Sequence, residues 1–319
     1  MKAAIFHEFG PPEVLKYEDV PGPEAGPGEI VVKVHAVTVN RTLDAAVRRG
    51  VETRRNVKPP LVLGVDPAGV VATVGEGVKK PKVGEKVCLL SRVPCLNCET
   101  CDAGDYINCG HPKMLGVACS GGYADYVKAP AACAVPMPNS LSFAEAAAVI
   151  RHGPTAHSLM FRLGRLKEGE SVLILGASGG LGTMGIQMAK AAGATVIAGA
   201  GAPDRVAAAL AIGADHAINY SEQDLTDAVR ELTGGKGVNQ VYDNVANPKI
   251  WPAALKSLAR EGRLVTAGAH AGPEVTLDCD VLYHNHLTIK GASGNARSDV
   301  NATLALAARL RMPIEKIFP

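Results

Sequence analysis

Apolar residues recur along this chain in two different patterns. Up to about residue 140 they form short runs rich in Val and Ile, and Gly and Pro separate these runs. Such runs between turn residues are typical of β-strands. The first half therefore predicts a β-rich domain. We expect strands over 2–6, 15–20, 30–40, 62–63, 69–74 and 86–90, and a helix over 42–49 with Thr42 as its N-cap.

In the second half, short apolar runs alternate with segments in which apolar residues recur at helical spacing. We expect strands over 171–175, 194–199, 215–219, 238–243, 262–267 and 287–291. We expect helices over 142–150, 154–163, 203–212, 222–233 and 248–259, and another that begins near Leu181. Ser142 and Glu145 have the spacing of a capping box for the first of these helices. The alternation predicts an α/β fold with a doubly wound parallel sheet. The domains are placed at 1–150 and 151–295, and a C-terminal segment over 296–319 follows.

The turn over residues 176–182 has the form of a dinucleotide-binding motif, because it joins a predicted strand to a predicted helix. Gly179 would let the backbone approach a pyrophosphate, and Gly182 would let the helix pack closely on the strand. Unpaired N–H groups at the helix N-terminus favour phosphate. An ordinary strand–turn–helix without a ligand is the alternative. The candidate cofactor contacts in this turn are Gly176, Ala177, Ser178, Gly179, Gly180, Leu181 and Gly182.

The end of the second strand of the sheet bears on cofactor preference. An acidic residue there would bind the ribose 2′-hydroxyl of NAD, but residues 198–203 contain no acid. Arg205, early in the next helix, is a phosphate-type donor, although a solvated helix face is an equally simple explanation. Gly268 and Ala269 follow the strand over 262–267, and we expect the cofactor over the carboxyl ends of these strands.

Four closely spaced cysteines stand in the first half: Cys95, Cys98, Cys101 and Cys109. This spacing can bring four thiolates to one tetrahedral zinc, and four protein ligands leave no open position, so the metal would be structural. Scattered buried cysteines or two disulfides are the alternative, which the spacing and a reducing compartment disfavour. The other cysteines are isolated and are predicted to be core residues: Cys88, Cys119, Cys133 and Cys279.

Composition disfavours several function classes. The chain has 319 residues, with 33 basic and 31 acidic side chains and a formal net charge of +2, so we expect neither a nucleic acid nor a membrane surface as partner. The N-terminus lacks the apolar core of a signal peptide, and no apolar run approaches the length of a membrane span. We therefore expect a cytoplasmic protein. Scarce Gln and 4% aromatic residues favour a hot habitat.

With these motifs in place, the chain resembles the medium-chain dehydrogenase/reductases over nearly its whole length. The chain shares features with two branches of this family. The cysteine lobe over 94–112 matches the structural-zinc motif of the zinc alcohol dehydrogenases. Residues 176–182 resemble the glycine turn of the quinone-reductase-like branch. The resemblance implies a GroES-like catalytic domain, a Rossmann NAD(P)-binding domain, one structural zinc per chain and a homodimer or homotetramer. In the quinone-reductase branch a basic residue and a Tyr fifteen positions later hold the NADP 2′-phosphate. Arg205 and Tyr220 match this pair, which favours NADP, with NAD possible.

The ligands of the family's catalytic zinc are replaced in this chain. Family alcohol dehydrogenases use a Cys after the long strand, a Gly-His-Glu turn, and a Cys or Asp before the domain-crossing helix. Here these positions are Asn40, Val65 with Asp66, and Arg151. Asn40 and Asp44 instead match an Asn-x-x-Asp pattern of the quinone-reductase branch. Family chains also continue by one more helix and strand beyond the equivalent of 317–319. We therefore expect the C-terminal segment to return toward the first domain. We expect that domain to be less complete than in the family, or to be covered by a partner subunit.

The resemblance thus implies an NADP-dependent oxidoreductase without catalytic zinc, acting on a small-molecule carbonyl, enone or quinone. Hydrogen bonds from donors such as Asn40, His152, Thr155 and Arg151 would polarise the carbonyl. The alternative is that these side chains pack the cleft wall or, for His152, that the histidine is structural. Two alternatives stay open: a zinc-dependent alcohol dehydrogenase with substituted ligands, and a non-catalytic NADP-binding protein. We also expect Arg151 to take Asp66 as its anionic partner. The candidate catalytic residues are Asn40, Asp44, Asp66, Arg151, His152 and Thr155.

Overall fold

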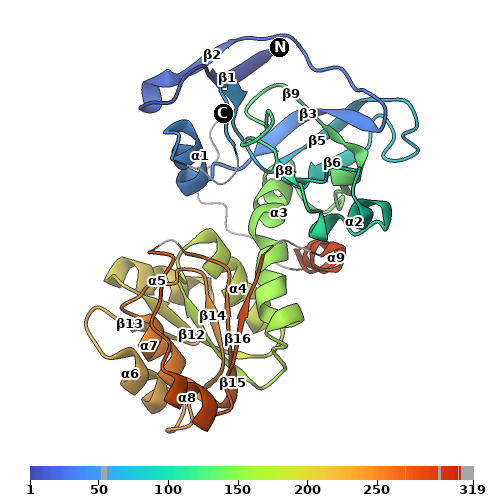
Figure 1. The fold of residues 1–319 in the computed structure, drawn as a ribbon. Helices are drawn as coiled ribbons and strands as arrows, with labels where there is room; N and C mark the ends of the chain where they lie inside the picture. The colour runs from blue at the N-terminus through green and yellow to red at the C-terminus, as the bar shows by residue number, and fades with distance from the viewer. Residues whose placement is uncertain (52–55, 270, 294–295, 308, 310–319) are drawn as a thin grey trace. The chain divides into compact units, whose positions relative to one another are not determined.

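The computed structural model describes residues 1–51, 56–269, 271–293, 296–307 and 309. These residues form two compact units, one over residues 1–151 together with 307 and 309, and the other over 152–306 (Figure 1). The boundary lies one residue beyond the position chosen from the sequence. The end of the predicted C-terminal segment, residues 310–319, lies outside the described residues.

The first unit is built on antiparallel strands. Its strands are β1 (Lys2–Phe6), β2 (Leu15–Asp19), β3 (Glu29–Val37), β4 (Leu61–Val62), β5 (Pro67–Val74), β6 (Lys86–Leu89), β7 (Arg92–Val93), β8 (Lys113–Met114), β9 (Tyr126–Pro130) and β10 (Ala134–Pro136). One sheet has the order β10-β6-β5-β3-β9, another has the order β2-β1-β4, and β7 pairs with β8. Alternate apolar residues such as Ile30 and Val32 of β3 point into a core with Val71 and Val87. The β-rich first half is therefore confirmed.

Helix α1 (Arg41–Arg48) shows a different cap from the one predicted. Thr42 was expected as the N-cap, and this is wrong because Thr42 already lies in the first turn. Asn40 is the N-cap. Its Oδ1 accepts the N–H of Leu43 at 3.2 Å, and the carboxylate of Asp44 accepts the N–H of Asn40 at 2.8 Å. These reciprocal bonds satisfy two backbone donors that a helix N-terminus would otherwise leave free.

Helix α3 (Phe143–His157) runs unbroken where the sequence predicts two helices, and π-helical turns over Ser158–Leu163 continue it. The predicted capping box is present, since Ser142 and Glu145 exchange backbone-to-side-chain hydrogen bonds. Pro154 lies inside the helix, where it removes one backbone donor and crowds the carbonyl of residue 150. Gly153 has a packing role, because a Cβ there would collide with the side chain of Thr303.

The second unit contains the predicted parallel sheet. Its strands are β11 (Ser171–Leu175), β12 (Thr195–Ala200), β13 (His216–Asn219), β14 (Val238–Asp243), β15 (Leu258–Thr266) and β16 (Thr288–Gly291). All pair in parallel, in the order β13-β12-β11-β14-β15-β16. The helices are α4 (Gly180–Ala191), α5 (Pro203–Ile212), α6 (Leu225–Leu232), α7 (Trp251–Lys256), α8 (Cys279–His284) and α9 (Arg297–Ala307). The strand order reverses between β11 and β14, and ligands of such sheets bind at this switch point.

Two features of the second unit differ from the sequence reading. Cys279 was expected in the core but is exposed, because it opens the unpredicted short helix α8. Helix α9 packs within the second unit, although the sequence assigned residues from 296 onward to a returning segment. Its buried Asp299 lies 2.8 Å from His157 Nδ1 and 2.7 Å from Arg162 Nε. Cys88 and Cys133 are buried as expected, and Cys119 is half-buried.

None of the helices in the described part of the chain combines the length and the apolar content that a membrane span needs.

Candidate cofactor site, cysteine lobe and active-site cluster

The glycine turn joins β11 to α4 with open backbone. Gly179 is the N-cap of α4 and offers no side chain to cap the first turn, and a helix N-terminus of this kind suits an anion. Gly176 has a φ of +68°, which favours glycine. A Cβ on Gly182 would collide with the Gly176 carbonyl oxygen, so only glycine lets α4 pack this closely. A Cβ on Gly179 would meet only that oxygen, at 3.5 Å, which leaves room for a ligand.

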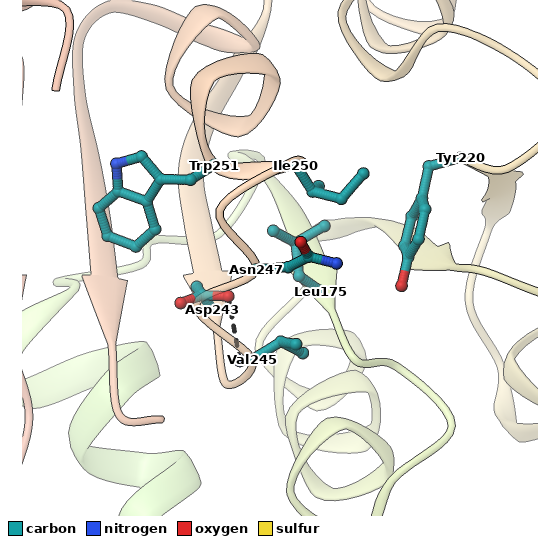
Figure 2. Close-up of a pocket in the computed structure, with 7 residues that line it drawn as sticks. All are labelled: Leu175, Tyr220, Asp243, Val245, Asn247, Ile250 and Trp251. Carbon is teal, nitrogen blue, oxygen red and sulfur yellow. Dashed lines mark hydrogen bonds between the residues drawn. The ribbon is translucent and has the colours of Figure 1, made fainter. Parts of the chain in front are cut away.

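A shallow pocket opens at the carboxyl ends of the parallel strands (Figure 2). Leu175 ends β11, Asp243 ends β14, and Tyr220 follows β13. Apolar walls and aromatic rings around a few polar groups suit a flat heteroaromatic base. Among these residues the sequence reading found only Tyr220. The lining residues are Leu175, Tyr220, Asp243, Val245, Asn247, Ile250 and Trp251.

The buried carboxylate of Asp243 shapes one wall of this pocket. Its Oδ1 accepts the N–H of Val245 at 3.1 Å, the contact dashed in Figure 2, and also the N–H of Ala246. Its Oδ2 accepts the hydroxyl of Thr266 at 2.6 Å. These bonds hold the loop that follows β14 against the carboxyl end of β15. Gly268 and Ala269 lie just beyond that end of β15.

Arg205 and Tyr220 lie close together at the same edge of the sheet. Arg205 is exposed in the first turn of α5, and Tyr220 is half-buried. Burial raises the pKa of Tyr220, and the nearby Arg205 charge opposes this rise. The Tyr220 ring packs over Gly201, where a Cβ would lie 2.9 Å from its Cε2 atom. A cation and a phenol hydroxyl thus stand together where a 2′-phosphate would need donors.

The four predicted cysteines converge on one point in the first unit. Their Sγ atoms all lie within 4.8 Å of one another, and those of Cys95 and Cys101 are 3.9 Å apart. Two thiolates about 2.3 Å from one tetrahedral zinc lie about 3.8 Å apart, so this donor set fits zinc. Within the described residues, no other group of three or more His, Cys, Asp or Glu side chains is placed to share a metal.

Hydrogen-bond donors surround these sulfurs. The N–H of Cys95 donates to Cys109 Sγ at 3.3 Å, and the Thr100 hydroxyl lies 3.2 Å from Cys98 Sγ. The hydrogen bond with Thr100, followed by the backbone of Gly110, lowers the pKa of the Cys98 thiol to about 5. Donors of this kind support thiolate ligands.

At the positions of the family's catalytic-zinc ligands, the structure brings together an ion pair. Val65 is fully buried, and Asp66 Oδ2 lies 3.3 Å from Arg151 Nε. Asp66 is 2% exposed. Burial raises the pKa of the Asp66 carboxyl to about 6, although the Arg151 charge and a hydrogen bond with Ser91 oppose the rise. Asp44 is close enough for its negative charge to add to the rise.

Asp44 is held by a phenol that sequence reasoning missed. The Tyr123 hydroxyl donates to Asp44 Oδ2 at 2.6 Å, and the same oxygen accepts the N–H of Asn40. Burial raises the pKa of Asp44, and the hydrogen bond from Tyr123 limits the rise. Because Oδ1 of Asn40 faces the N–H of Leu43, its Nδ2 group is turned away from this bond and can donate elsewhere.

His152 and Thr155 belong to the part of α3 that lies in the second unit. The His152 ring lies against the glycine turn, since a Cβ on Gly180 would be 2.5 Å from its Nε2 atom. Thr155 is half-buried almost one helical turn further along. Arg151 of the ion pair directly precedes His152, so adjacent residues of one helix serve the carboxylate cluster and the candidate phosphate turn.

Two family models match the chain: "Alcohol dehydrogenase GroES-like domain" over residues 26–139 and "Zinc-binding dehydrogenase" over residues 180–309. An alcohol dehydrogenase of Geobacillus stearothermophilus is 33% identical, covering 97% of this chain and 89% of that protein. A quinone oxidoreductase of Salmonella typhimurium is 32% identical over 87% and 76%. The solved structure of a thermostable alcohol dehydrogenase from Pyrobaculum aerophilum is 31% identical with a TM-score of 0.82, over 97% and 89%. The chain therefore belongs to the medium-chain dehydrogenase/reductase superfamily, with its GroES-like and Rossmann domains, and is an NAD(P)-dependent oxidoreductase.

Proposed function

We propose that this protein is an NADP-dependent oxidoreductase that transfers hydride to a small-molecule carbonyl, enone or quinone without a catalytic zinc. The observation that carries this proposal is the Arg151–Asp66 pair at the family's zinc position. Zinc needs three or four N, S or O ligands. Asn40 is a poor ligand, Val65 is none, and a guanidinium is a permanent cation that repels a metal.

The residues around the glycine turn fit the nucleotide. The N-terminus of α4 would hold the pyrophosphate, the pocket beside Trp251 would hold the base, and Arg205 with Tyr220 would hold the 2′-phosphate. Bound NADPH supplies the hydride. The donors at Asn40 Nδ2 and on the Arg151 guanidinium would hydrogen-bond the substrate oxygen as it gains negative charge, in the role that a Lewis-acidic metal has elsewhere.

A turnover screen tests this proposal. NADPH oxidation should accelerate with at least one of benzaldehyde, cinnamaldehyde and 1,4-benzoquinone when the protein is added. A chelator that leaves the cysteine-bound zinc in place should not slow it. Tight NADPH binding without turnover of any member of these three classes would instead identify a non-catalytic NADP-binding protein.

Arg205→Ala should weaken NADPH binding about tenfold or more, because a charge-assisted contact to phosphate contributes about 1.5–3 kcal/mol and each ~1.4 kcal/mol is a decade. NADH binding should stay nearly unchanged. Titration of intrinsic fluorescence measures both dissociation constants. Lys236→Ala removes a positive charge from an exposed side chain near the amino end of β14 and serves as the control. An equal loss for both cofactors would assign Arg205 a role in folding instead.

The protein should associate into dimers or larger oligomers through β16. Among the described residues this strand pairs with β15 alone and ends the parallel sheet, so its outer N–H and C=O groups invite the same strand of a second copy. Light scattering at micromolar concentration should give a multiple of 33.0 kDa. Thr288→Lys should weaken association by placing like charges across the strand pair. A monomer mass for the parent protein would reject this prediction.

A further inference from the structure

Four polar side chains from four separate segments of the first unit meet around Asp66. Asp66 precedes β5, Asp44 lies on α1, Arg151 on α3, and Tyr123 precedes β9. Asp66 and Asp44 are only 2% and 8% exposed. From β6, the thiol of Cys88 also faces Asp66, and burial raises the pKa of that thiol to about 12, so it is neutral. Burial likewise raises the pKa of Tyr123, which stays a neutral phenol.

The charges of this carboxylate cluster do not balance when both acids are ionised. Arg151 compensates one carboxylate, and both acids share this same cation. Each acid also keeps one buried oxygen, Asp44 Oδ1 or Asp66 Oδ2, without a hydrogen-bond partner. An uncompensated, poorly solvated charge in the interior is costly. Binding one proton removes this cost, so the two carboxyls should titrate as a pair with one proton retained.

The retained proton belongs to Asp66 rather than Asp44. Asp44 Oδ2 accepts two short hydrogen bonds, from Tyr123 and from the Asn40 backbone, and both favour its ionised form. The ionised form of Asp66 is less well stabilised. Its contact with Arg151 Nε is 3.3 Å long, against 2.6 and 2.8 Å for the two hydrogen bonds that Asp44 accepts. The Ser91 hydroxyl is hydrogen-bonded to Asp66 and is half-buried, so it links the buried acid to more open surroundings.

We propose that Asp66 holds the proton that the reduced substrate takes up and releases it through the Ser91 hydroxyl. This inference rests on the proposed hydride transfer. As hydride adds to the carbonyl carbon, or to the β-carbon of an enone, the π electron pair moves to oxygen. A new O–H bond forms there with a proton from the Ser91 hydroxyl, and Ser91 takes the Asp66 proton as the Asp66 O–H bond breaks. Asp66 is left as a carboxylate beside Arg151, and water later returns the proton.

Carbon-13 NMR of the aspartate carboxyl carbons tests the proton-holding role without any substrate. One resonance of the parent protein should titrate near pH 6, whereas ordinary aspartates titrate near ~3.9. That resonance should be missing from Asp66→Asn. In Tyr123→Phe the pair should titrate at higher pH, because Asp44 loses the donor that stabilises its charge. If the Asp66 resonance titrates in the ordinary range, the inference is overturned whatever the protein reduces.

Protein stability gives a second readout. The folded state binds this proton more tightly than the unfolded chain does. Asp66 therefore contributes stability that is fully present below the unfolded pKa of about 3.9 and is lost as pH rises through the folded pKa of about 6. Asn at position 66 stays neutral, so Asp66→Asn should not show this loss in urea titrations over the same pH window. An identical pH dependence in both proteins would count against the inference.

Single-turnover kinetics test the transfer step. With NADPH and cinnamaldehyde, hydride transfer in the parent should slow as pH rises above about 6. Asp66→Asn should be about a hundredfold slower at pH 6 and should lack this dependence, because an amide releases no proton. Ser91→Ala should also be slow. Asp227→Asn, which neutralises an exposed carboxylate on α6, is the control for both measurements.

The outcomes separate this inference from the proposed function. If the parent turns over no aldehyde, enone or quinone, the proposed function fails while NMR still decides where the proton is held. If the parent reduces cinnamaldehyde and Asp66→Asn keeps the parent's rate or its pH dependence, only the proton-supply inference fails. A circular dichroism spectrum and a cooperative urea transition like those of the parent verify that Asp66→Asn is folded.

Discussion

Cys98→Ser will release zinc, lower the thermal midpoint by about 5 °C or more and open the lobe over 94–112 to proteases. The lobe has few apolar side chains, and ordering each residue costs roughly 1–2 kcal/mol, which burial alone does not offset here. Zinc binding to four thiolates contributes folding free energy, with apparent values of about 10–16 kcal/mol in small zinc-binding peptides. A loss of only a few kcal/mol shifts the midpoint of a unit this size by several degrees. Calorimetry, zinc content and limited proteolysis measure the three effects.

Cys279→Ser is the matched control for that experiment. It also replaces one thiol by a hydroxyl, but Cys279 is exposed on α8 and belongs to no cluster. Its zinc content, midpoint and cleavage pattern should equal those of the parent. A Cys98→Ser protein that holds no zinc yet keeps the parent's midpoint and cleavage pattern would show that the lobe does not depend on the metal.

The parallel sheet could be predicted because its signals are local. Each strand is a short buried run, such as Ser171–Leu175 or Val238–Asp243, and a helical pattern follows most of them. Right-handed crossovers then restrict the strand order to few choices. Helix α3 shows where local signals fail. Gly153 and Pro154 suggest a break, but Gly153 packs against Thr303, a residue 150 positions later, and the helix continues.

The candidate site also divides into contacts between residues close in sequence, which could be predicted, and contacts between distant residues, which could not. The cysteine cluster could be found because its members lie within fifteen residues of one another. The contact between Asp44 and Tyr123 joins residues 79 positions apart, and nothing around Tyr123 in the sequence marks it. Trp251 and Ile250 were missed as pocket residues for a similar reason. The bonds of Asp243 position the loop that carries them, and these bonds exist only once the sheet has formed.

In the mechanism proposed above, the carboxylate cluster and its neighbours replace the catalytic metal. A catalytic zinc has two tasks in carbonyl reduction, to stabilise the oxygen that gains charge and to help protons reach it. Here the first task falls to Arg151 with Asn40, and the second to Asp66 with Ser91. Asp66 also helps to position Arg151, since its Oδ2 lies 3.3 Å from the guanidinium Nε.

One zinc ion per chain is the expected metal content, since only the cysteine lobe offers a complete ligand set among the described residues. Arg151→Ala should leave this content unchanged and lower the rate of hydride transfer about a hundredfold or more, the typical effect of removing one donor from a developing oxyanion. The variant also leaves Asp66 without its cation, which can destabilise the fold. Arg151→Ala combined with Asp66→Asn removes the unpaired charge, so its stability shows how much of the Arg151→Ala loss comes from that charge, and its rate is compared with that of Asp66→Asn alone.

Arg151→Lys keeps the charge but lacks the planar fork of a guanidinium, so it should recover part of the lost rate if electrostatic stabilisation is the role. A rise in activity in Arg151→Ala would instead show that the ion pair closes the site against substrate. Rates are measured in single turnovers with NADPH and cinnamaldehyde, and metal content by elemental analysis. Both roles of Arg151 require that Asp66 binds no metal. Two zinc ions per chain, or anomalous scattering from a metal beside Asp66, would reject both and restore a zinc-dependent alcohol dehydrogenase with substituted ligands.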